Sequence, residues 1–226
     1  MNALLITATD TEIGKTVLTT ALIAYWHKYC PDRSLGVMKP IQAGTGDREM
    51  YTQLFSIDQS LEEINPLYFS APLAPPLAAE KEGRIVDLAI VWQAFDRLRQ
   101  KRDFVLVEAL GGLGSPVTHE LTVADVASDW RLPTVLVVPV RLGAIAQAVA
   151  NVALARQSNI YLKGIVLNCN QPRSDEEIAN WTPTDLIESL TNIPVLGCLP
   201  YLTNPNDLNQ LALVASDLDL EKLLPI

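Results

Sequence analysis

The chain has 226 residues, with 17 lysines and arginines against 26 aspartates and glutamates, and its formal net charge is −9. A hydrophobic fraction of 49% and a charged fraction of 19% are typical of a globular protein with a large core, and they exclude a disordered, collagen-like or coiled-coil chain. The acidic balance argues against a general nucleic-acid-binding or membrane-surface protein, because such proteins carry a basic excess.

Cysteine and histidine are scarce. The three cysteines, Cys30, Cys169 and Cys198, are far apart and form no C-x-x-C motif, which indicates buried free thiols in a reducing compartment. With only His27 and His119, a zinc site is not expected. Residues 1–7 have neither the basic segment nor the cleavage pattern of a signal peptide, and no apolar run approaches the roughly 20 residues that span a bilayer. We therefore expect a cytoplasmic protein that binds neither nucleic acid nor membrane.

Short apolar runs alternate along the chain with longer segments of helical pattern. The runs predict strands at Ala3–Thr7, Leu35–Lys39, Phe104–Val107, Thr134–Val138, Leu162–Leu167 and Val195–Leu199. Helices are predicted at Lys15–Tyr29, Ile85–Arg102, Val123–Arg131, Gly143–Gln157, Asp175–Leu190 (interrupted at Thr182-Pro183) and Asn206–Leu224. The helix from Ile85 has one apolar face, made of Ile85, Leu88, Val91, Trp92, Phe95 and Leu98. The stretch from Gln42 to about Ala79 is irregular and rich in turn-forming residues.

The predicted strands are near-continuous apolar runs, as in parallel sheets that are covered on both faces. Alternation of strands and helices gives right-handed crossovers and a doubly wound layer. We find no linker, internal repeat or low-complexity segment. The sequence therefore predicts a single α/β domain over residues 1–226, with a mostly parallel, doubly wound sheet and helices on both of its faces.

The first strand leads directly into a loop that ends in Gly14-Lys15-Thr16 at the start of a helix. Loop N–H groups, the helix N-terminus and the Lys15 charge suit the phosphates of a nucleoside triphosphate, and the Thr16 hydroxyl suits Mg²⁺. The strict pattern G-x-x-x-x-G-K-[ST] is not met, because Thr9 stands where its first glycine belongs. An ordinary strand-to-helix turn is the alternative.

One charged residue ends the second predicted strand, and another lies in the segment after it. Lys39 precedes Pro40, which favours extended backbone and directs the lysine from the carboxyl edge of the strand, where ligands of open α/β sheets bind. A solvated surface charge is the alternative for Lys39. Asp47 lies in the turn-rich stretch, where most aspartates cap helices or face water.

Further candidate site residues lie at the ends of three later strands or just beyond them. Glu108 ends an apolar run at the same predicted edge and suits Mg²⁺, or it faces solvent; Gly111 just beyond it lets the backbone pass close to a ligand. Gly143 and Ala144 begin a helix whose N–H groups suit a carboxylate, or they form a plain helix start. Asn168 offers an amide to a base edge, or it forms a turn.

Taken together, these motifs make the sequence similar to the dethiobiotin synthetase family, whose members have a P-loop NTPase fold. The resemblance covers nearly the whole chain. The matching segments, in family order, are Thr9–Val17 as an elongated phosphate loop, Lys39-Pro40, Asn65-Pro66 through Glu82-Gly83, Val107-Glu108 with Gly111-Gly112-Leu113, Leu142-Gly143, Asn168 and Gly197–Leu202.

The resemblance implies a reaction and its site residues. The family uses ATP, Mg²⁺ and CO₂ or bicarbonate to close a cyclic urea on 7,8-diaminopelargonic acid, through a carbamate and a carbamic–phosphoric mixed anhydride, and it is homodimeric. By resemblance, Lys39, Lys15 and Thr11 are the catalytic residues. Nucleotide-binding residues are implied at Glu12, Ile13, Gly14, Lys15, Thr16, Val17, Asn168, Pro200, Tyr201 and Leu202. Substrate-binding residues are implied at Thr11, Lys39, Ala43, Gly111, Gly143 and Ala144, and metal-binding residues at Thr16, Asp47 and Glu108.

The chain differs from the family pattern at several positions. Ala8 stands where glycine is usual, Ala43 where serine is frequent, Ala109-Leu110 where Gly-Ala is usual and Ala146 where asparagine is usual. Ala8 and Ala109 add a Cβ beside the expected phosphates, which could crowd them, and Ala43 removes a hydroxyl. None of these differences removes a charged participant.

Three other functions remain as alternatives. A partition or septum-site switch ATPase usually has an extra lysine early in the phosphate loop, and residues 7–13 contain none. A cobyrinate-type amidotransferase needs a glutaminase domain of about 100 residues or more, with a Cys/His pair that this chain lacks. A catalytically inactive nucleotide-binding relative is favoured only if the alanine differences abolish ATP binding.

Overall fold

A computed structural model describes residues 2–226, except for the side chain of Asp47. Six strands form one sheet in the order β2-β5-β1-β6-β7-β8, and every neighbouring pair is parallel. These strands are β1 (Ala3–Ala8), β2 (Leu35–Met38), β5 (Phe104–Glu108), β6 (Thr134–Pro139), β7 (Leu162–Asn168) and β8 (Val195–Leu199). Two short parallel strands, β3 (Ile41–Ala43) and β4 (Leu67–Phe69), form a second sheet. The predicted doubly wound parallel sheet is confirmed.

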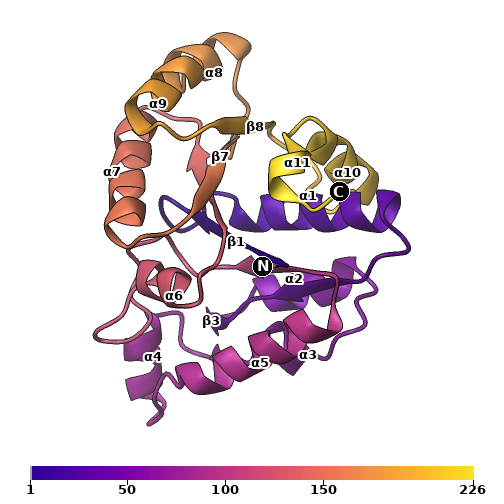
Figure 1. The fold of residues 1–226 in the computed structure, drawn as a ribbon, viewed down its shortest axis with the longest axis vertical. Coiled ribbons are helices and arrows are strands. Elements are labelled where there is room, and N and C mark those ends of the chain that lie inside the picture. Colours follow the sequence, from indigo (N-terminus) through magenta and orange to yellow (C-terminus); the bar gives the residue numbers. More distant parts are fainter. Residues whose placement is uncertain (1) are drawn as a thin grey trace.

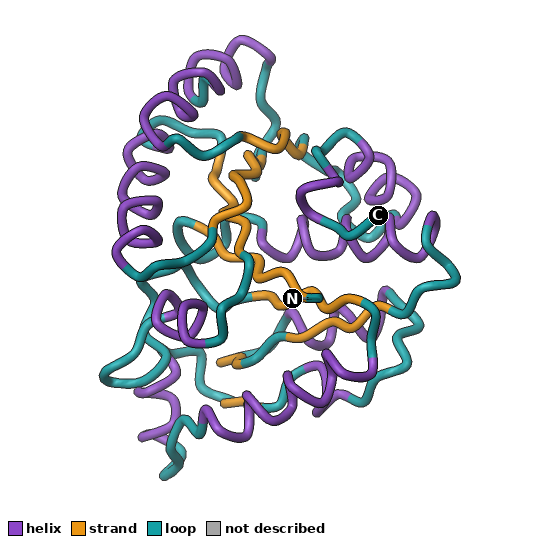
Figure 2. Tube along the Cα trace, viewed as in Figure 1, coloured by secondary structure: helices purple, strands orange, loops and turns teal. Residues whose placement is uncertain are grey.

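Helices cover both faces of the main sheet. Figure 1 shows α1, α10 and α11 together on one side and α5, α6 and α7 on the other, and Figure 2 shows the strands running between them. The helices are α1 (Lys15–Tyr29), α2 (Asp47–Leu54), α3 (Leu61–Ile64), α4 (Pro75–Lys81), α5 (Leu88–Lys101), α6 (Val123–Asp129), α7 (Ala144–Gln157), α8 (Asp175–Trp181), α9 (Thr184–Thr191), α10 (Leu208–Ser216) and α11 (Leu220–Leu223).

The strands are apolar on both faces because each face packs into its own buried cluster. In β1, Leu4 and Ile6 belong to the cluster under α1 and α10, whereas Ala3 and Leu5 belong to the cluster under α5 and α6. Successive side chains of a strand point to opposite faces, so a strand covered twice needs apolar residues at every position. This explains the uninterrupted apolar runs in the sequence.

Two sequence predictions about local structure are wrong. The helix expected from Ile85 begins at Leu88, because the Asp87 carboxylate caps it and accepts hydrogen bonds from two N–H groups of its first turn. Ile85 therefore lies outside the helix and is 78% exposed. The stretch after Gln42, expected to be irregular, contains α2, α3, α4 and the second sheet. These elements have three to eight residues, too few to show a clear periodicity.

The carboxyl ends of β1, β5 and β2 lie side by side at one edge of the sheet. The register pairs Ile6 with Glu108 and Met38 with Val107. The loop after β1, the residue after β2 and the last residue of β5 therefore meet at this edge. Ligands of open parallel sheets bind outside this edge.

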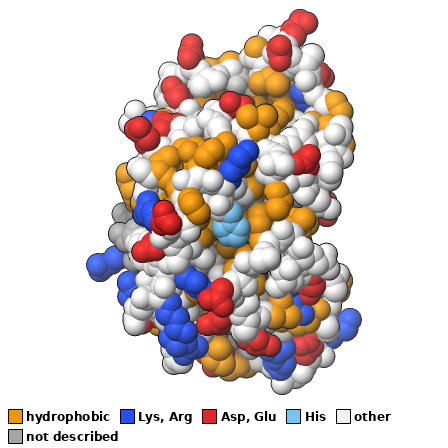
Figure 3. Space-filling view, turned by 90° about the vertical axis from the view of Figure 1, so that its right-hand side faces the viewer, with side chains coloured by type: hydrophobic (Ala, Val, Ile, Leu, Met, Phe, Trp, Pro, Cys, Tyr) orange, Lys and Arg blue, Asp and Glu red, His pale blue; other side chains and the backbone are white. Residues whose placement is uncertain are grey.

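Neither the distribution of surface side chains nor the cysteines indicate where a functional site lies. On the face shown in Figure 3, acidic, basic and apolar side chains are interspersed. Cys30, Cys169 and Cys198 are free thiols, as the sequence predicts, but only Cys169 is buried, so the prediction of burial is wrong for Cys30 and Cys198. Within residues 2–226, none of the helices combines the length and the apolar character that crossing a membrane requires.

Candidate active site

The loop between β1 and α1 wraps around the start of a 15-residue helix. Gly14 has a left-handed φ of 105°, and a Cβ at this position would lie 2.1 Å from Nδ2 of Asn168, so only glycine fits. Lys15 is 6% exposed, and its ammonium donates to the carbonyl of Asp10 at 3.2 Å. A helix start next to a lysine is a positive local environment in an otherwise acidic protein, and it suits a phosphate group.

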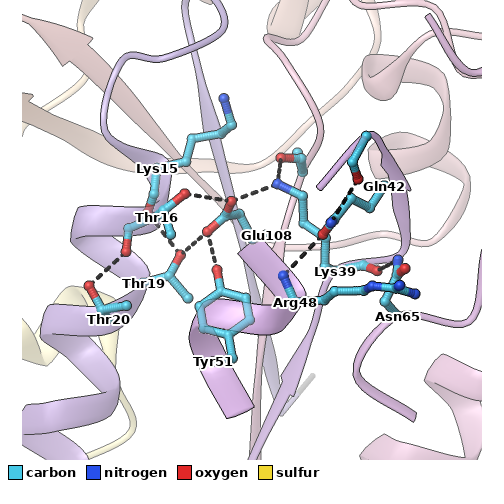
Figure 4. Close-up of polar contacts among 12 residues, drawn as sticks. Lys15, Thr16, Thr19, Thr20, Lys39, Gln42, Arg48, Tyr51, Asn65 and Glu108 are labelled. Carbon is cyan, nitrogen blue, oxygen red and sulfur yellow. Dashed lines mark hydrogen bonds and ion pairs between the residues drawn. The ribbon is translucent and has the colours of Figure 1, made fainter. Parts of the chain in front are cut away.

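Glu108 is the centre of a buried polar cluster (Figure 4). Its side chain is fully buried and accepts hydrogen bonds from Thr16 Oγ1 at 3.0 Å and Thr19 Oγ1 at 2.9 Å. The Lys39 ammonium lies 2.6 Å from Glu108 Oε1, and the Tyr51 hydroxyl donates to Oε2. A buried carboxylate is tolerated only when it is paired and hydrogen-bonded, and this one has four donors.

Lys39 is held at the end of β2 by its own backbone. Its N–H donates to the carbonyl of Ile64 at 2.7 Å, and its carbonyl accepts from Asn65 Nδ2 at 2.7 Å. Its ammonium also donates to the carbonyl of Ala109 at 3.3 Å. Lys39 is 4% exposed. The alternative of a solvated surface charge is therefore excluded for Lys39, as is a solvent-facing carboxylate for Glu108.

A cavity of about 660 Å³ opens at this edge of the sheet. Its walls come from the loop after β1, the segment after β2, the start of α4 and the loop after β5. The sequence-predicted site residues that line it are Thr11, Glu12, Gly14, Lys15, Thr16, Lys39, Ala43, Gly111 and Glu108. One cavity thus brings together the described residues to which the resemblance assigns phosphate, carbamate or metal binding: Thr11, Lys15, Thr16, Lys39 and Glu108.

Asp47 lies outside the described side chains, so its predicted metal role has no structural account. It is the first residue of α2, after Gly46. This helix start is held by Glu49, which accepts hydrogen bonds from the Gly46 N–H, Gln42 and Arg48. Burial alone would raise the pKa of Glu49, but the hydrogen bonds from Arg48, Gly46 and the other donors outweigh it and lower the pKa from 4.5 to about 2.

The predicted nucleotide-base residues lie away from the cavity, next to the phosphate loop. Asn168 ends β7 and donates to the Ile13 carbonyl at 2.8 Å and to Asn170 Oδ1 at 2.6 Å. Asn170 donates in turn to the Glu12 carbonyl at 2.7 Å. The amide oxygen of Asn168 is buried and has no hydrogen-bond partner among the described residues. The two asparagines therefore join the end of β7 to the phosphate loop.

Three of the predicted nucleotide-binding side chains point into the protein. Ile13 and Leu202 are buried in the cluster under α1 and α10, and Val17 packs against the same cluster. Their predicted contacts with a nucleotide are thus restricted to backbone groups. Pro200 and Tyr201, just after β8, are exposed. Because Asn168 pairs with Leu199, these two residues follow the strand end beside Asn168.

Gly143 and Ala144 lie outside the cavity wall. Gly143 caps α7 with a left-handed φ of 85°. The Ala144 N–H donates to the Arg141 carbonyl at 3.1 Å, so the expectation of a free N–H group at Ala144 is wrong. The Ala144 N–H group is already hydrogen-bonded within the turn that precedes α7.

The residues that differ from the family pattern lie in different surroundings. Ala8 and Ala109 belong to the buried clusters on the two faces of the sheet, and neither lines the cavity. The expected crowding by their methyl groups is therefore wrong, because these groups point into the core. Ala43 and Leu110 do line the cavity, and Ala146 is exposed on α7.

Sequence reasoning missed three residues of this site. Thr19 lies one turn after Thr16 on α1, a spacing that places both on one side of a helix, so a signal was present. Tyr51 contacts Glu108 from a helix that the sequence did not predict, and it carried no signal. Asn170 lies two residues after Asn168, beyond the end of β7, and no motif in the sequence singled it out.

Comparisons with known proteins place this chain among described relatives. A family model described as an AAA domain matches residues 2–207. Proteins named ATP-dependent dethiobiotin synthetase are 65% identical in Gloeothece citriformis, over 100% of both chains, and 58% identical in Crocosphaera subtropica, over 99% of this chain and 100% of the relative. A third, from Synechocystis, is 53% identical over 97% of this chain and 94% of the relative.

Solved structures share the fold at low identity. A ParA family ATPase from Chlorobium tepidum has a TM-score of 0.61 and 14% identity, over 100% of this chain and 98% of that one. The cell division ATPase MinD from Pyrococcus furiosus has a TM-score of 0.61 and 15% identity, over 99% of this chain and 100% of that one. At this identity the likeness shows the fold alone.

Proposed function

The chain belongs to the family of ATP-dependent dethiobiotin synthetases, ligases of biotin biosynthesis, and from this premise we propose how the cavity at the edge of its sheet carries out the reaction. The observation that carries the proposal is the position of Lys15, Thr16, Lys39 and Glu108 on the wall of one cavity. A triphosphate bound there lies next to two ammonium groups and one carboxylate.

The proposed reaction has three steps. One amine of 7,8-diaminopelargonic acid adds to CO₂ and loses a proton, which gives a carbamate. A carbamate oxygen attacks the γ-phosphorus of ATP, and ADP leaves with the electrons of the broken bond. The second amine attacks the carbonyl carbon of the resulting mixed anhydride, phosphate leaves, and the cyclic urea of dethiobiotin is closed.

The residues of the cavity act by position and charge. Lys15 binds the phosphates, while Lys39 and Thr11 hold the carbamate oxygens against the γ-phosphoryl group. Phosphoryl transfer asks for little covalent help from a protein, so alignment and neutralisation of charge supply the rate enhancement. Ala43 and Gly111 form the neighbouring wall, where the alkyl diamine passes.

The donor set at Glu108 fits a magnesium ion. Thr16 Oγ1 and Glu108 Oε1 lie 3.0 Å apart, and both are hard oxygen ligands of the kind that Mg²⁺ prefers. Thr16, Glu108 and, by resemblance, Asp47 would hold the ion. When bound, it would neutralise charge on the phosphate oxygens.

The unsatisfied oxygen of Asn168 fits a purine amino group. A buried acceptor without a partner costs about 1–3 kcal/mol, and the exocyclic amino group of adenine is a donor that would remove this cost. We propose that Asn168 reads the base, with Pro200 and Tyr201 beside it. Glu12, Ile13, Gly14 and Val17 contribute backbone to the phosphates, and Leu202 supports the pocket from the core.

We also propose that the enzyme is a homodimer in the cytoplasm. The exposed face of α7 and the residue before its cap carry apolar side chains: Leu142 is 75% exposed and Val149 is 37% exposed. Gly143 and Ala144 lie outside their own cavity, so they would reach the substrate carboxylate of a second copy, with Gly143 and later residues of the first turn as donors.

We further propose that residues 1–226 form one domain. Both buried clusters draw on strands from the first and the last parts of the chain, so neither part has a separate core. A single calorimetric unfolding transition is expected, and two separated transitions would contradict this.

The test of the function is an assay of the purified chain with diaminopelargonic acid, bicarbonate and MgATP, with the product identified by mass. Formation of the cyclic urea, equal in amount to the ADP released, is expected. Controls leave out the diamine or replace Mg²⁺ with EDTA. If ADP forms equally well without the diamine and no cyclic urea is found, the chain is a switch-type ATPase and the proposal is wrong.

A further inference from the structure

The two oxygens of the Glu108 carboxylate have different partners. Oε1 accepts from Thr16 at 3.0 Å and from Lys39 at 2.6 Å, next to the phosphate loop. Oε2 accepts from Thr19 at 2.9 Å and from the Tyr51 hydroxyl. Figure 4 shows Tyr51 reaching the carboxylate from the side opposite to Lys15. One oxygen thus faces the cavity residues, and the other faces two hydroxyl groups of the interior.

A carboxylate in this position needs a fixed orientation. Rotation about its last bond would exchange the two oxygens and change which one lies beside Thr16. A carboxylate oxygen offers about two lone-pair directions, and two hydroxyl donors therefore occupy Oε2. Oε1 also has two donors, Thr16 and Lys39, but both of these residues line the cavity, so Oε1 is the oxygen that a bound cation can reach.

Thr19 by itself does not secure this orientation. Its hydroxyl lies 2.9 Å from Glu108 Oε2 and also 2.9 Å from the carbonyl of Lys15. A hydroxyl has a single proton to donate, so Thr19 divides it between two acceptors. The Tyr51 hydroxyl is a second donor to the same oxygen, and its ring is fully buried, which holds the donor in place.

We propose that Tyr51 is a positioning residue for the metal site. Its hydroxyl holds Oε2 of Glu108, so that Oε1 is presented beside Thr16 as the oxygen that binds the divalent cation. Because Tyr51 lies on α2, one helical turn after Asp47, the same hydrogen bond fixes this helix against the end of β5. The inference rests on the proposed function, in which Glu108 and Thr16 hold the metal.

A packing role for the ring is the competing explanation. Tyr51 belongs to the buried cluster under α1, with Phe55 and Ile64. The variant Tyr51→Phe keeps the ring and removes only the hydroxyl, so it separates the two roles. Residues that orient the ligands of a metal typically change metal affinity about 10- to 100-fold when they are altered, whereas a ring that only packs has no effect specific to the metal.

The experiment measures ADP binding by calorimetry in EDTA and again with Mg²⁺, for the wild type, Tyr51→Phe and the matched control Tyr29→Phe, whose side chain is 50% exposed. In Tyr51→Phe we expect unchanged affinity in EDTA and a gain on adding Mg²⁺ that is about tenfold smaller than in the wild type. Tyr29→Phe keeps the full gain. Thr19→Val, which removes the other donor to Oε2, should also lose part of the gain.

The outcomes separate this inference from the function on which it rests. If the wild type gains affinity with Mg²⁺ and Tyr51→Phe gains as much, the inference is wrong and the metal site stands. An equal loss in EDTA and in Mg²⁺ means that Tyr51 has a structural role only, which also overturns it. If the wild type itself gains nothing with Mg²⁺, the metal site at Glu108 is wrong, and the role of Tyr51 falls with it.

Discussion

At the scale of single residues, the site rests on a buried ion pair between Lys39 and Glu108. Removing two charges from water costs several kcal/mol per ion, and attraction offsets this only where hydrogen bonds satisfy the remaining atoms. Here Thr16, Thr19 and Tyr51 supply those bonds. Both members of the pair line the cavity. A ligand that brings an anion for Lys39 and a cation for Glu108 can therefore replace this ion pair with new ones.

The sequence identified Lys39 and Glu108 because each follows an apolar strand and parallel strands end at the same edge. It could not identify Tyr51. That residue lies 57 positions from Glu108, in a segment without periodic pattern. Only the tertiary fold brings its hydroxyl to the carboxylate, so no local rule of spacing or composition signals the contact.

Replacement of Lys39 by glutamine should slow the chemical step more than it weakens nucleotide binding. Glutamine keeps a donor near Glu108 but removes the charge that we propose to face the carbamate and the γ-phosphoryl group. Loss of such electrostatic stabilisation typically lowers kcat about 10²- to 10³-fold, while ADP affinity should stay close to that of the wild type. Steady-state kinetics and calorimetry measure the two quantities, and thermal unfolding checks that the variant is folded. A variant with normal kcat and weakened ADP binding would refute the carbamate role.

At the scale of elements, the sequence patterns located the strands of the main sheet and the helices that cover it, but not the short elements between Gln42 and Lys81. α1 begins and ends as predicted, at Lys15 and Tyr29, because a glycine precedes it and apolar residues fill it. The eight-residue α2 is shorter than the roughly 12–15 residues at which isolated helices become even marginally stable. Its stability comes from tertiary contacts and from its capping carboxylate, which composition alone does not reveal.

Glu49 should stabilise α2 in a way that depends on pH. Its pKa is lowered from 4.5 to about 2 in the folded protein, so its contribution is complete above about pH 4.5 and is lost as the pH falls toward 2. Glu49→Gln should therefore be less stable at pH 7, and the difference from the wild type should shrink toward pH 2–3. Because the side chain is 35% exposed, solvent screening limits the effect to about 1 kcal/mol or less.

Urea unfolding at several pH values measures this difference in the free energy of unfolding. Glu176→Gln, at an exposed acid of α8, is the matched control and should differ little from the wild type at every pH. A difference for Glu49→Gln that stays constant from pH 7 to pH 3 would show that the Glu49 charge does not cap the helix.

At the scale of the whole molecule, the sheet and its two buried clusters were readable from the sequence. Apolar residues at successive positions of each strand require cover on both faces, and the alternation of elements requires parallel connections. Contacts between two copies of the chain in a dimer leave no comparable pattern in the sequence. The exposed face of α7 contains Ala146, Val149, Ala150 and Ala153, and small apolar residues on a helix are equally typical of a core.

The proposed dimer makes that face of α7 essential for the substrate but not for the nucleotide. Val149→Glu places like charges in an interface formed by two copies of this helix, so sedimentation at micromolar concentration should show a monomer where the wild type is a dimer. Its kcat/KM for the diamine should fall, because the partner's helix start no longer anchors the carboxylate, while MgADP affinity stays unchanged. Leu213→Glu, at a 62%-exposed position of α10, should change neither property. A wild type that sediments as a monomer and turns over normally would mean that the cavity binds the whole substrate within one copy.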